Sequence, residues 1–173
     1  GYAHRVAFKQ SKHAFSRDVT VTKSMLEDLT GQQVLGYRAP SFSIKSENSW
    51  AYDALIEAGY SYDSSLYPTW HPRYGNKSTR LSPFKLKTDR GEITIVPLAV
   101  TTLSLLGKRA HLPAAGGAYW RLLPRFYIDW ALKRINHKEQ RPFVCYFHPW
   151  ELDSLQPRFR ELSRLTQLRH YGG

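Results

Sequence analysis

The sequence is poor in cysteine, in acidic residues and in long hydrophobic stretches. Cys145 is the only cysteine among 173 residues, which excludes an internal disulfide, and its place in an apolar segment favours packing in the core. No stretch approaches about 18 consecutive apolar residues, so we expect no membrane-spanning helix. The length is sufficient for one domain with a hydrophobic core of its own.

Acidic residues number 14 against 25 lysines and arginines, which gives a formal net charge of +11. This balance favours an anionic partner such as a nucleic acid, an anionic glycan or a membrane surface. The basic residues are scattered, however, and no recognition motif accompanies them, so we expect no nucleic-acid partner. The densest basic group lies near the C-terminus, where interleaved apolar residues predict an amphipathic helix. This group comprises Leu155, Arg158, Phe159, Arg160, Leu162, Arg164, Leu165, Leu168 and Arg169.

Strand-like and helix-like segments alternate along the chain, which predicts an α/β fold with parallel strands covered by helices. A chain of this length could hold part of a barrel or a small open sheet. Helices are expected from Ser16, at about Glu47–Ala58 and at about Pro124–Asn136, and Gly31 and Gly59 follow the first two. Strands are expected at 34–37, 60–62, 92–100 and 143–147, and loops at 68–90 and 113–118.

Helical spacing also predicts which side chains of each helix face the core. Ser46 is the expected N-cap of the second helix. The expected inward residues are Val19, Thr22, Met25, Leu26 and Leu29 in the first helix, Trp50, Ala54, Leu55 and Ala58 in the second, and Tyr127, Trp130, Ala131 and Ile135 in the third.

Three of the expected strands end in polar residues. The apolar run 143–147 leads directly into His148, and Arg38 and Asp63 follow two earlier strands. The carboxyl ends of parallel strands converge on one face, where sites are built, and an imidazole there can give or take a proton. Each residue also has a structural interpretation: His148 as a histidine satisfied at a strand end, Arg38 as a surface or salt-bridge arginine, and Asp63 as a turn or cap residue.

Four segments, in order along the chain, make the sequence recognisable. They are Gly36–Ile44 (GYRAPSFSI), Tyr62–Pro68 (YDSSLYP), Ala115–Pro124 (AGGAYWRLLP) and Phe147–Asp153 (FHPWELD). With this order and spacing the chain resembles polysaccharide deacetylases of the NodB-like type. The resemblance is closest to the branch associated with exosortase and PEP-CTERM exopolysaccharide systems of Gram-negative bacteria.

The resemblance implies a distorted (β/α) barrel and hydrolysis of the acetamide groups of an N-acetylated polysaccharide. In that family a metal, usually zinc, is held by one Asp and two His, a second Asp is the general base, and a strand-end His is the general acid. The chemistry is coherent, because an acetamide is a poor electrophile that a Lewis acid must polarise. The departing amine needs a proton, and the tetrahedral oxyanion needs donors.

Matched to the family's motifs, His148 corresponds to the general acid and Arg38 to the arginine that orients the catalytic Asp. The backbone amide of Ser41 corresponds to an oxyanion contact. Asp63 falls in the segment that helps to orient the His or the Arg, although this branch departs there from the family's usual Asp-x-x-Asp-Trp motif. Tyr119 and Trp150 are the expected substrate-binding aromatics.

His4 corresponds to the second histidine of the family's His-x-x-x-His metal motif, and a frayed terminal histidine is the alternative. The first histidine and the segment with both aspartates do not occur in this sequence. We therefore expect residues 1–173 to be the C-terminal two-thirds of one deacetylase domain, an incomplete barrel that is inactive alone. Zinc would belong to the intact protein. Members of this branch often lack a signal peptide, which favours the cytoplasm.

The aromatic residues leave a second function open. The chain holds 11 Tyr, 8 Phe and 5 Trp, which fits a core but also a surface that stacks on sugar rings. Tyr119 and three tryptophans lie near expected loops, namely Trp70, Trp120 and Trp150. A non-catalytic glycan-binding protein that uses the same surface is the alternative to the enzyme.

Overall fold

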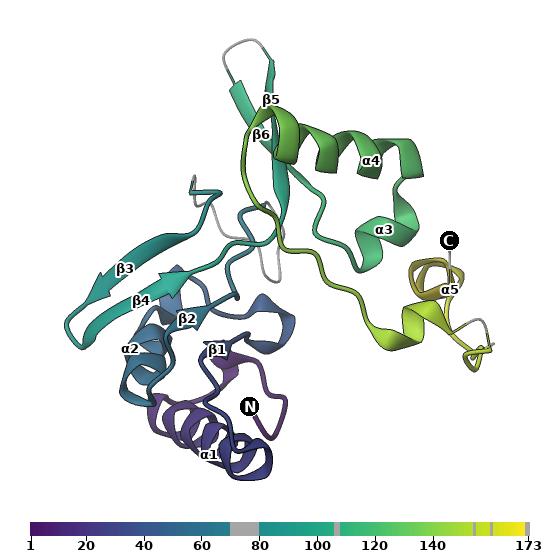
Figure 1. Cartoon of the computed structure of the whole chain (residues 1–173). Helices are drawn as coiled ribbons and strands as arrows, with labels where there is room; N and C mark the ends of the chain where they lie inside the picture. Colours follow the sequence, from purple (N-terminus) through teal and green to yellow (C-terminus); the bar gives the residue numbers. More distant parts are fainter. Residues whose placement is uncertain (70–79, 106–107, 154, 160, 172–173) are drawn as a thin grey trace. The chain divides into compact units, whose positions relative to one another are not determined.

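A computed structural model describes all residues except 70–79, 106–107, 154, 160 and 172–173. For residues 104, 105, 108, 109, 165 and 168–170 it describes the backbone only. The chain divides into two compact units, Gly1–Leu98 and Ala99–Gly173, which are described separately below (Figure 1). Over the residues that the structure describes, no helix combines the length and the apolar character needed to cross a membrane.

The first unit contains a four-stranded sheet in the order β1-β2-β4-β3. Its strands are β1 (Gly36–Tyr37), β2 (Tyr62–Asp63), β3 (Phe84–Thr88) and β4 (Gly91–Ile95). The strands β1, β2 and β4 are parallel, which confirms the expected parallel strands, and β3 is antiparallel to β4. The pairings Tyr37 with Asp63 and Asp63 with Ile95 place the ends of these three strands side by side. Within the described part this sheet is open.

Strand β3 lies in the segment 68–90, so the expectation of a continuous loop there was wrong. Phe84 and Leu86 alternate with Lys85 and Lys87, and the two apolar side chains pack against the core of the unit. This alternation of period two is typical of a half-buried strand. The surrounding Pro, Gly, Asn and Ser residues obscured it.

Helix α1 (Lys12–Thr30) begins earlier than expected, because Ser11 rather than Ser16 precedes it. The Ser11 Oγ accepts a hydrogen bond from the Ala14 N–H at 3.2 Å, as an N-cap does. The C-terminal prediction is confirmed: Gly31 adopts the left-handed conformation at φ 65°. The expected inward face is confirmed for Val19, which is buried with Phe15, and was wrong for three apolar residues of the second half, which are exposed. These are Met25, Leu26 and Leu29.

Helix α2 (Trp50–Glu57) follows a short 3-10 turn, η3 (Ser46–Asn48). The predicted N-cap was therefore wrong, since Ser46 begins the 3-10 turn and Ser49 precedes α2. The inward residues Ala54 and Leu55 are confirmed as buried, and Trp50 and Ala58 pack against the core as partly buried residues. The core of the unit joins α1, α2 and the sheet through Ala7, Phe15, Val19, Tyr37, Ala39, Ile44, Ala51, Tyr52, Ala54, Leu55, Tyr60, Leu66, Ile93 and Ile95.

The second unit begins with an antiparallel hairpin, β5 (Val100–Leu105) and β6 (Lys108–Pro113). It continues with α3 (Ala118–Leu122), α4 (Arg125–Lys133) and a π-helical turn, η4 (Arg134–Lys138). The predicted third helix is confirmed with a longer end, and Ala131 and Ile135 are buried as expected. Trp130 was wrongly expected to face the core and is 40% exposed, whereas Ile128 is buried.

The segment 143–148 is not the buried strand that the sequence predicts. It forms one isolated parallel bridge, between Gly116 and Tyr146, and Phe143, Phe147 and His148 are exposed. The segment is held at its middle, where the Ala99 N–H donates to the Val144 carbonyl at 3.1 Å and the Tyr146 N–H to the Ala115 carbonyl at 2.7 Å. The prediction relied on aromatic and β-branched composition, which favours a strand but does not show that a neighbouring strand is present to pair with it.

The C-terminal part of the second unit contains a 3-10 turn, η5 (Pro149–Leu152), and helix α5 (Arg164–Tyr171). A helix is therefore confirmed only for the second half of the expected amphipathic segment. Leu155 lies outside any helix and is 89% exposed, and Phe159 is exposed as well.

Candidate functional site

In the first unit, Arg38 is attached to the end of the neighbouring strand. The residue follows β1 directly. Its Nε donates to the Ser64 carbonyl at 3.0 Å and its terminal nitrogen to the Ser64 Oγ at 2.9 Å. Ser64 follows Asp63 at the end of β2, and its own hydroxyl donates to the Val96 carbonyl at 2.9 Å, just after β4. The guanidinium is thus held by Ser64 after β2, and Ser64 is itself held by the residue after β4.

Asp63, the residue before Ser64, is completely buried. One carboxylate oxygen accepts the Ser65 hydroxyl at 2.6 Å and the other accepts the Ser65 N–H at 2.8 Å. The Ser65 Oγ in turn accepts the Ala39 N–H at 2.8 Å. Burial raises the pKa of Asp63 to about 7, against the opposing effect of the Ser65 hydrogen bonds and of Arg38. A carboxyl group in this position fastens the turn that follows Arg38.

That turn has an unusual backbone. Ser41 and Phe42 both have positive φ, at 53° and 51°, a region that costs free energy for residues other than glycine. Phe42 is held by burial against Tyr67, with ring centroids 5.6 Å apart, and by its N–H donating to the Ala39 carbonyl at 3.0 Å. Ser41 is exposed, so the strained turn presents this residue to solvent.

His4 also lies in the first unit, near the start of the chain. It is exposed and has a φ of 48°, and its N–H donates to the Gly1 carbonyl at 3.2 Å. Among the residues described, no group of three or more His, Cys, Asp or Glu side chains is arranged to hold a metal ion. A single imidazole does not hold zinc firmly, so these residues do not by themselves fit a zinc site.

In the second unit, His148 lies in an aromatic cluster. Its ring stacks on Trp150, with centroids 5.6 Å apart and an angle of 11° between planes, and meets Tyr146 edge-on at 5.8 Å. The Arg121 guanidinium lies 4.9 Å from the centroid of the Trp150 ring. Trp150 therefore connects an exposed histidine to a cation that comes from α3.

Glu151 completes this arrangement. Its carboxylate forms an ion pair with Arg121, and its second oxygen accepts a hydrogen bond from the backbone N–H of His148 at 3.1 Å. The two side chains of the ion pair are only 7% and 17% exposed, for Glu151 and Arg121 respectively. Sequence reasoning did not single out either residue, although both lie in the segments that carry the resemblance. Tyr119, the other expected aromatic, is partly buried on α3.

Two consecutive glycines allow the histidine segment to approach α3. Gly116 and Gly117 have φ values of +111° and +60°. A Cβ at Gly116 would lie 2.0 Å from the Tyr146 carbonyl oxygen, and one at Gly117 would lie 2.5 Å from the Tyr146 hydroxyl. The glycine pair at the start of α3 is thus required by close packing against Tyr146.

The predicted site residues are distributed between the two units. Arg38, Ser41 and Asp63 lie in the first unit, in or next to the loops at its parallel strand ends. His4 belongs to the same unit but not to these loops. The second unit contains Tyr119, His148 and Trp150. Trp70, which was also expected near a sugar groove, lies outside the described residues.

The structure resembles a crystal structure from Mycobacterium smegmatis described as a "putative polysaccharide deacetylase", with a TM-score of 0.56 and 18% sequence identity. The match covers 96% of this chain and 51% of that protein, so this chain spans about half of its length. The likeness defines the class of fold, a mixed α/β fold of the kind found in that protein.

The sequence comparison identifies the family. A family model described as "Domain of unknown function (DUF3473)" matches residues 64–173, and the chain belongs to this family. No curated protein matches the sequence.

Proposed function

We propose that the protein containing this chain is a hydrolase that removes acetyl groups from an N-acetylated polysaccharide. The observation that carries the proposal is the network at the parallel strand ends, in which Ser64 holds the Arg38 guanidinium and buried Asp63 fastens the turn through Ser65. Polar groups fixed at the carboxyl ends of parallel strands are the usual material of active sites in α/β folds. The likeness in fold to the mycobacterial protein and the resemblance of the four sequence segments support it.

In this proposal each residue has a separate task. His148 is the general acid that gives a proton to the leaving amine. Arg38 orients the carboxylate of the general-base Asp, whose segment does not occur in this sequence. Asp63 holds the turn that follows Arg38. The amide of Ser41 donates to the oxyanion, while Tyr119 and Trp150 contact the sugar.

The proposal also includes a metal and a larger fold for the whole protein. One divalent metal, zinc, would polarise the acetamide and make bound water more acidic when present. His4 is the single ligand that we propose from this chain, with the other ligands outside residues 1–173. The same proposal places the chain in a distorted (β/α) barrel of an exopolysaccharide system.

The test is acetate release by the whole protein from N-acetylglucosamine oligomers. We expect His148→Ala to lower turnover by about 10²- to 10⁴-fold, the range for loss of a general acid, with unchanged metal content. His137→Ala is the matched control, because His137 is an exposed histidine of the same unit outside the His148 cluster. Loss of the metal in His148→Ala, or unchanged turnover, would show that the assigned role is wrong.

A non-catalytic glycan-binding protein is the second candidate. It is favoured by the exposed Trp120 on α3 and by the stacked Trp150 ring, since tryptophan faces suit sugar rings. Oligomer binding that Trp120→Ala weakens, without acetate release by the intact metal-loaded protein, would support this candidate over the enzyme.

A further inference from the structure

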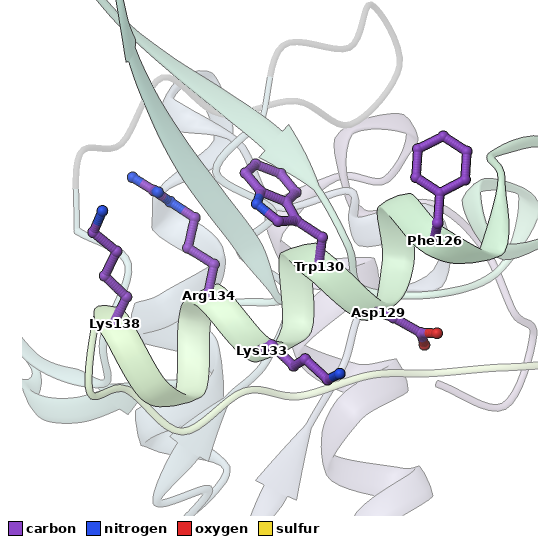
Figure 2. A pocket seen from close by; sticks show the side chains of 6 residues that line it. All are labelled: Phe126, Asp129, Trp130, Lys133, Arg134 and Lys138. Atoms are coloured by element: carbon purple, nitrogen blue, oxygen red, sulfur yellow. The ribbon is translucent and has the colours of Figure 1, made fainter.

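Helix α4 and the turn η4 carry a row of aromatic and basic side chains that is separate from their buried apolar residues. Figure 2 shows Phe126, Trp130, Arg134 and Lys138 rising from one side of the helix, each four residues after the last, with Asp129 and Lys133 beside them. The opposite face is apolar and buried. It consists of Ile128, Ala131 and Ile135.

These six side chains line an open pocket of about 610 Å³. At one end the pocket is aromatic, with Phe126 77% exposed and Trp130 40% exposed. The other end is basic, with Arg134 and Lys138. Two large exposed aromatic side chains line the same pocket, and such a patch, unlike a single exposed apolar residue, is typical of a binding surface.

Trp130 and Arg134 are held in place by their neighbours. The Arg134 Nε donates to the Thr102 carbonyl at 2.9 Å and lies 3.5 Å from the Glu139 carboxylate. Its guanidinium lies 5.8 Å from the centroid of the Trp130 ring. The aromatic surface is therefore partly ordered before any ligand binds, which reduces the entropy lost on binding.

The charge of the pocket is positive. Arg134 lies 3.5 Å from the Glu139 carboxylate and Asp129 lies 3.9 Å from the Arg125 Nε, so the excess positive charge of the pocket comes from Lys133 and Lys138. Neither lysine forms a salt bridge with any residue that the structure describes. A ligand with an apolar ring face and anionic groups complements both ends.

We propose that the outer face of α4 and η4 binds a carboxylate-bearing polysaccharide, with a sugar ring on Trp130 and carboxylates at Lys133 and Lys138. The inference rests on the proposed function in taking a polysaccharide as the ligand, and it adds that the polymer is acidic. Aromatic faces stack on sugar rings through their C–H groups, and the lysines supply point charges that tolerate variable spacing.

An anionic membrane is the competing partner for a basic, aromatic helix face. The arrangement favours the polysaccharide. A membrane-surface helix carries its basic residues at the flanks of a broad apolar face, whereas here Arg134 and Lys138 continue the aromatic row itself and the surface is hollowed. A linear polymer with alternating ring faces and charges matches such a row.

The experiment measures binding of the whole protein to polygalacturonate of defined length. Neutral N-acetylglucosamine oligomers and vesicles of phosphatidylglycerol with phosphatidylcholine are measured in parallel. We expect Lys133→Glu with Lys138→Glu to weaken polygalacturonate binding by about tenfold or more, and added salt to weaken it in the wild type. Trp130→Leu should weaken it by about fivefold, as for a central aromatic contact.

The matched control is Lys12→Glu with Lys87→Glu, which makes the same change in net charge at two exposed lysines of the first unit. This control should bind within about twofold of the wild type. Equal loss in both double variants, or preference for the neutral oligomer, would overturn the proposal. Vesicle binding that the Lys133 and Lys138 substitutions abolish, without polygalacturonate binding, would assign the surface to a membrane instead.

Acetate release from the neutral oligomer is recorded for the same variants. Polygalacturonate binding by a protein that releases no acetate would uphold the acidic ligand and refute the proposed deacetylase. Acetate release without any polygalacturonate binding would do the reverse. The two proposals can therefore fail separately.

Discussion

At the scale of single residues, Asp63 combines complete burial with an ionisable side chain. Its carboxyl group is buried and both oxygens accept hydrogen bonds from Ser65. The free-energy cost of burying a charge therefore competes with the value of holding the turn at Arg38. This competition has a consequence for the dependence of stability on pH.

Because burial raises the pKa of Asp63 from 3.8 to about 7, the folded state keeps a proton that the unfolded state releases. We therefore expect this group's contribution to stability to be complete below about pH 4 and to be lost as the pH rises toward 7. The loss should be on the order of a few kcal/mol in the free energy of unfolding. Asp63→Asn removes the titration. The free energy of unfolding in urea is measured for both proteins between pH 4 and pH 8. The wild type should lose stability over this range and the variant should lose much less. Parallel pH dependences would show that Asp63 does not have the raised pKa.

The largely buried ion pair of Glu151 and Arg121 is a second test at this scale. Glu151→Gln leaves a poorly solvated guanidinium without its carboxylate and weakens the acceptor of the His148 N–H. We expect a loss of about 1–3 kcal/mol in the free energy of unfolding. The exposed pair of Arg125 and Asp129 offers the control, since Asp129→Asn should cost less than about 0.5 kcal/mol. Chemical denaturation compares the two, and equal effects would mean that the buried pair does not organise the His148 cluster.

At the scale of elements, local chemistry in the sequence was a good guide to where helices end. Gly31 has the left-handed conformation expected of a C-cap, and the third helix was located correctly. The inward faces were predicted less well, because helical spacing says which residues share a face and not whether a neighbour covers it. Leu29 and Trp130 are exposed for this reason. The segment that ends at His148 was mistaken for a strand because ladder partners are not encoded locally.

The glycine pair at α3 tests how closely that segment packs. Gly116→Ala places a methyl group against the backbone carbonyl of Tyr146, which cannot move aside as a flexible side chain could. We expect a loss of about 3 kcal/mol or more in the free energy of unfolding. Gly31→Ala is the control, because Gly31 also has a positive φ, at 65° in the left-handed region, but has open space around the new Cβ, so it should cost only about 1 kcal/mol of backbone strain. Similar losses in thermal or urea unfolding would contradict the close approach.

At the scale of the whole molecule, the sequence predicted that Arg38 and Asp63 end neighbouring strands, but not the contacts around them. Arg38 and Asp63 do lie at neighbouring strand ends. Their partners Ser64 and Ser65 were not predicted, because serines following a strand end are common in turns and only the register of β1 against β2 gives them a task. The link from Glu151 to Arg121 spans 30 residues, and such a pairing depends on tertiary structure.

The metal proposal belongs to this scale, because it depends on more than the residues of this chain. Within residues 1–173 we propose His4 as a ligand, and the described donors include no cluster that could hold a metal. One imidazole binds zinc weakly, whereas three protein ligands bind it firmly. We therefore expect the 173-residue chain to bind zinc weakly in calorimetric titration and to release no acetate, and the whole protein to bind one equivalent tightly. His4→Ala should weaken zinc binding in the whole protein, while His13→Ala, a nearby exposed histidine, should not. Tight stoichiometric binding by the chain alone would mean that its own residues form a complete site, and the division of the ligands proposed above would then be wrong.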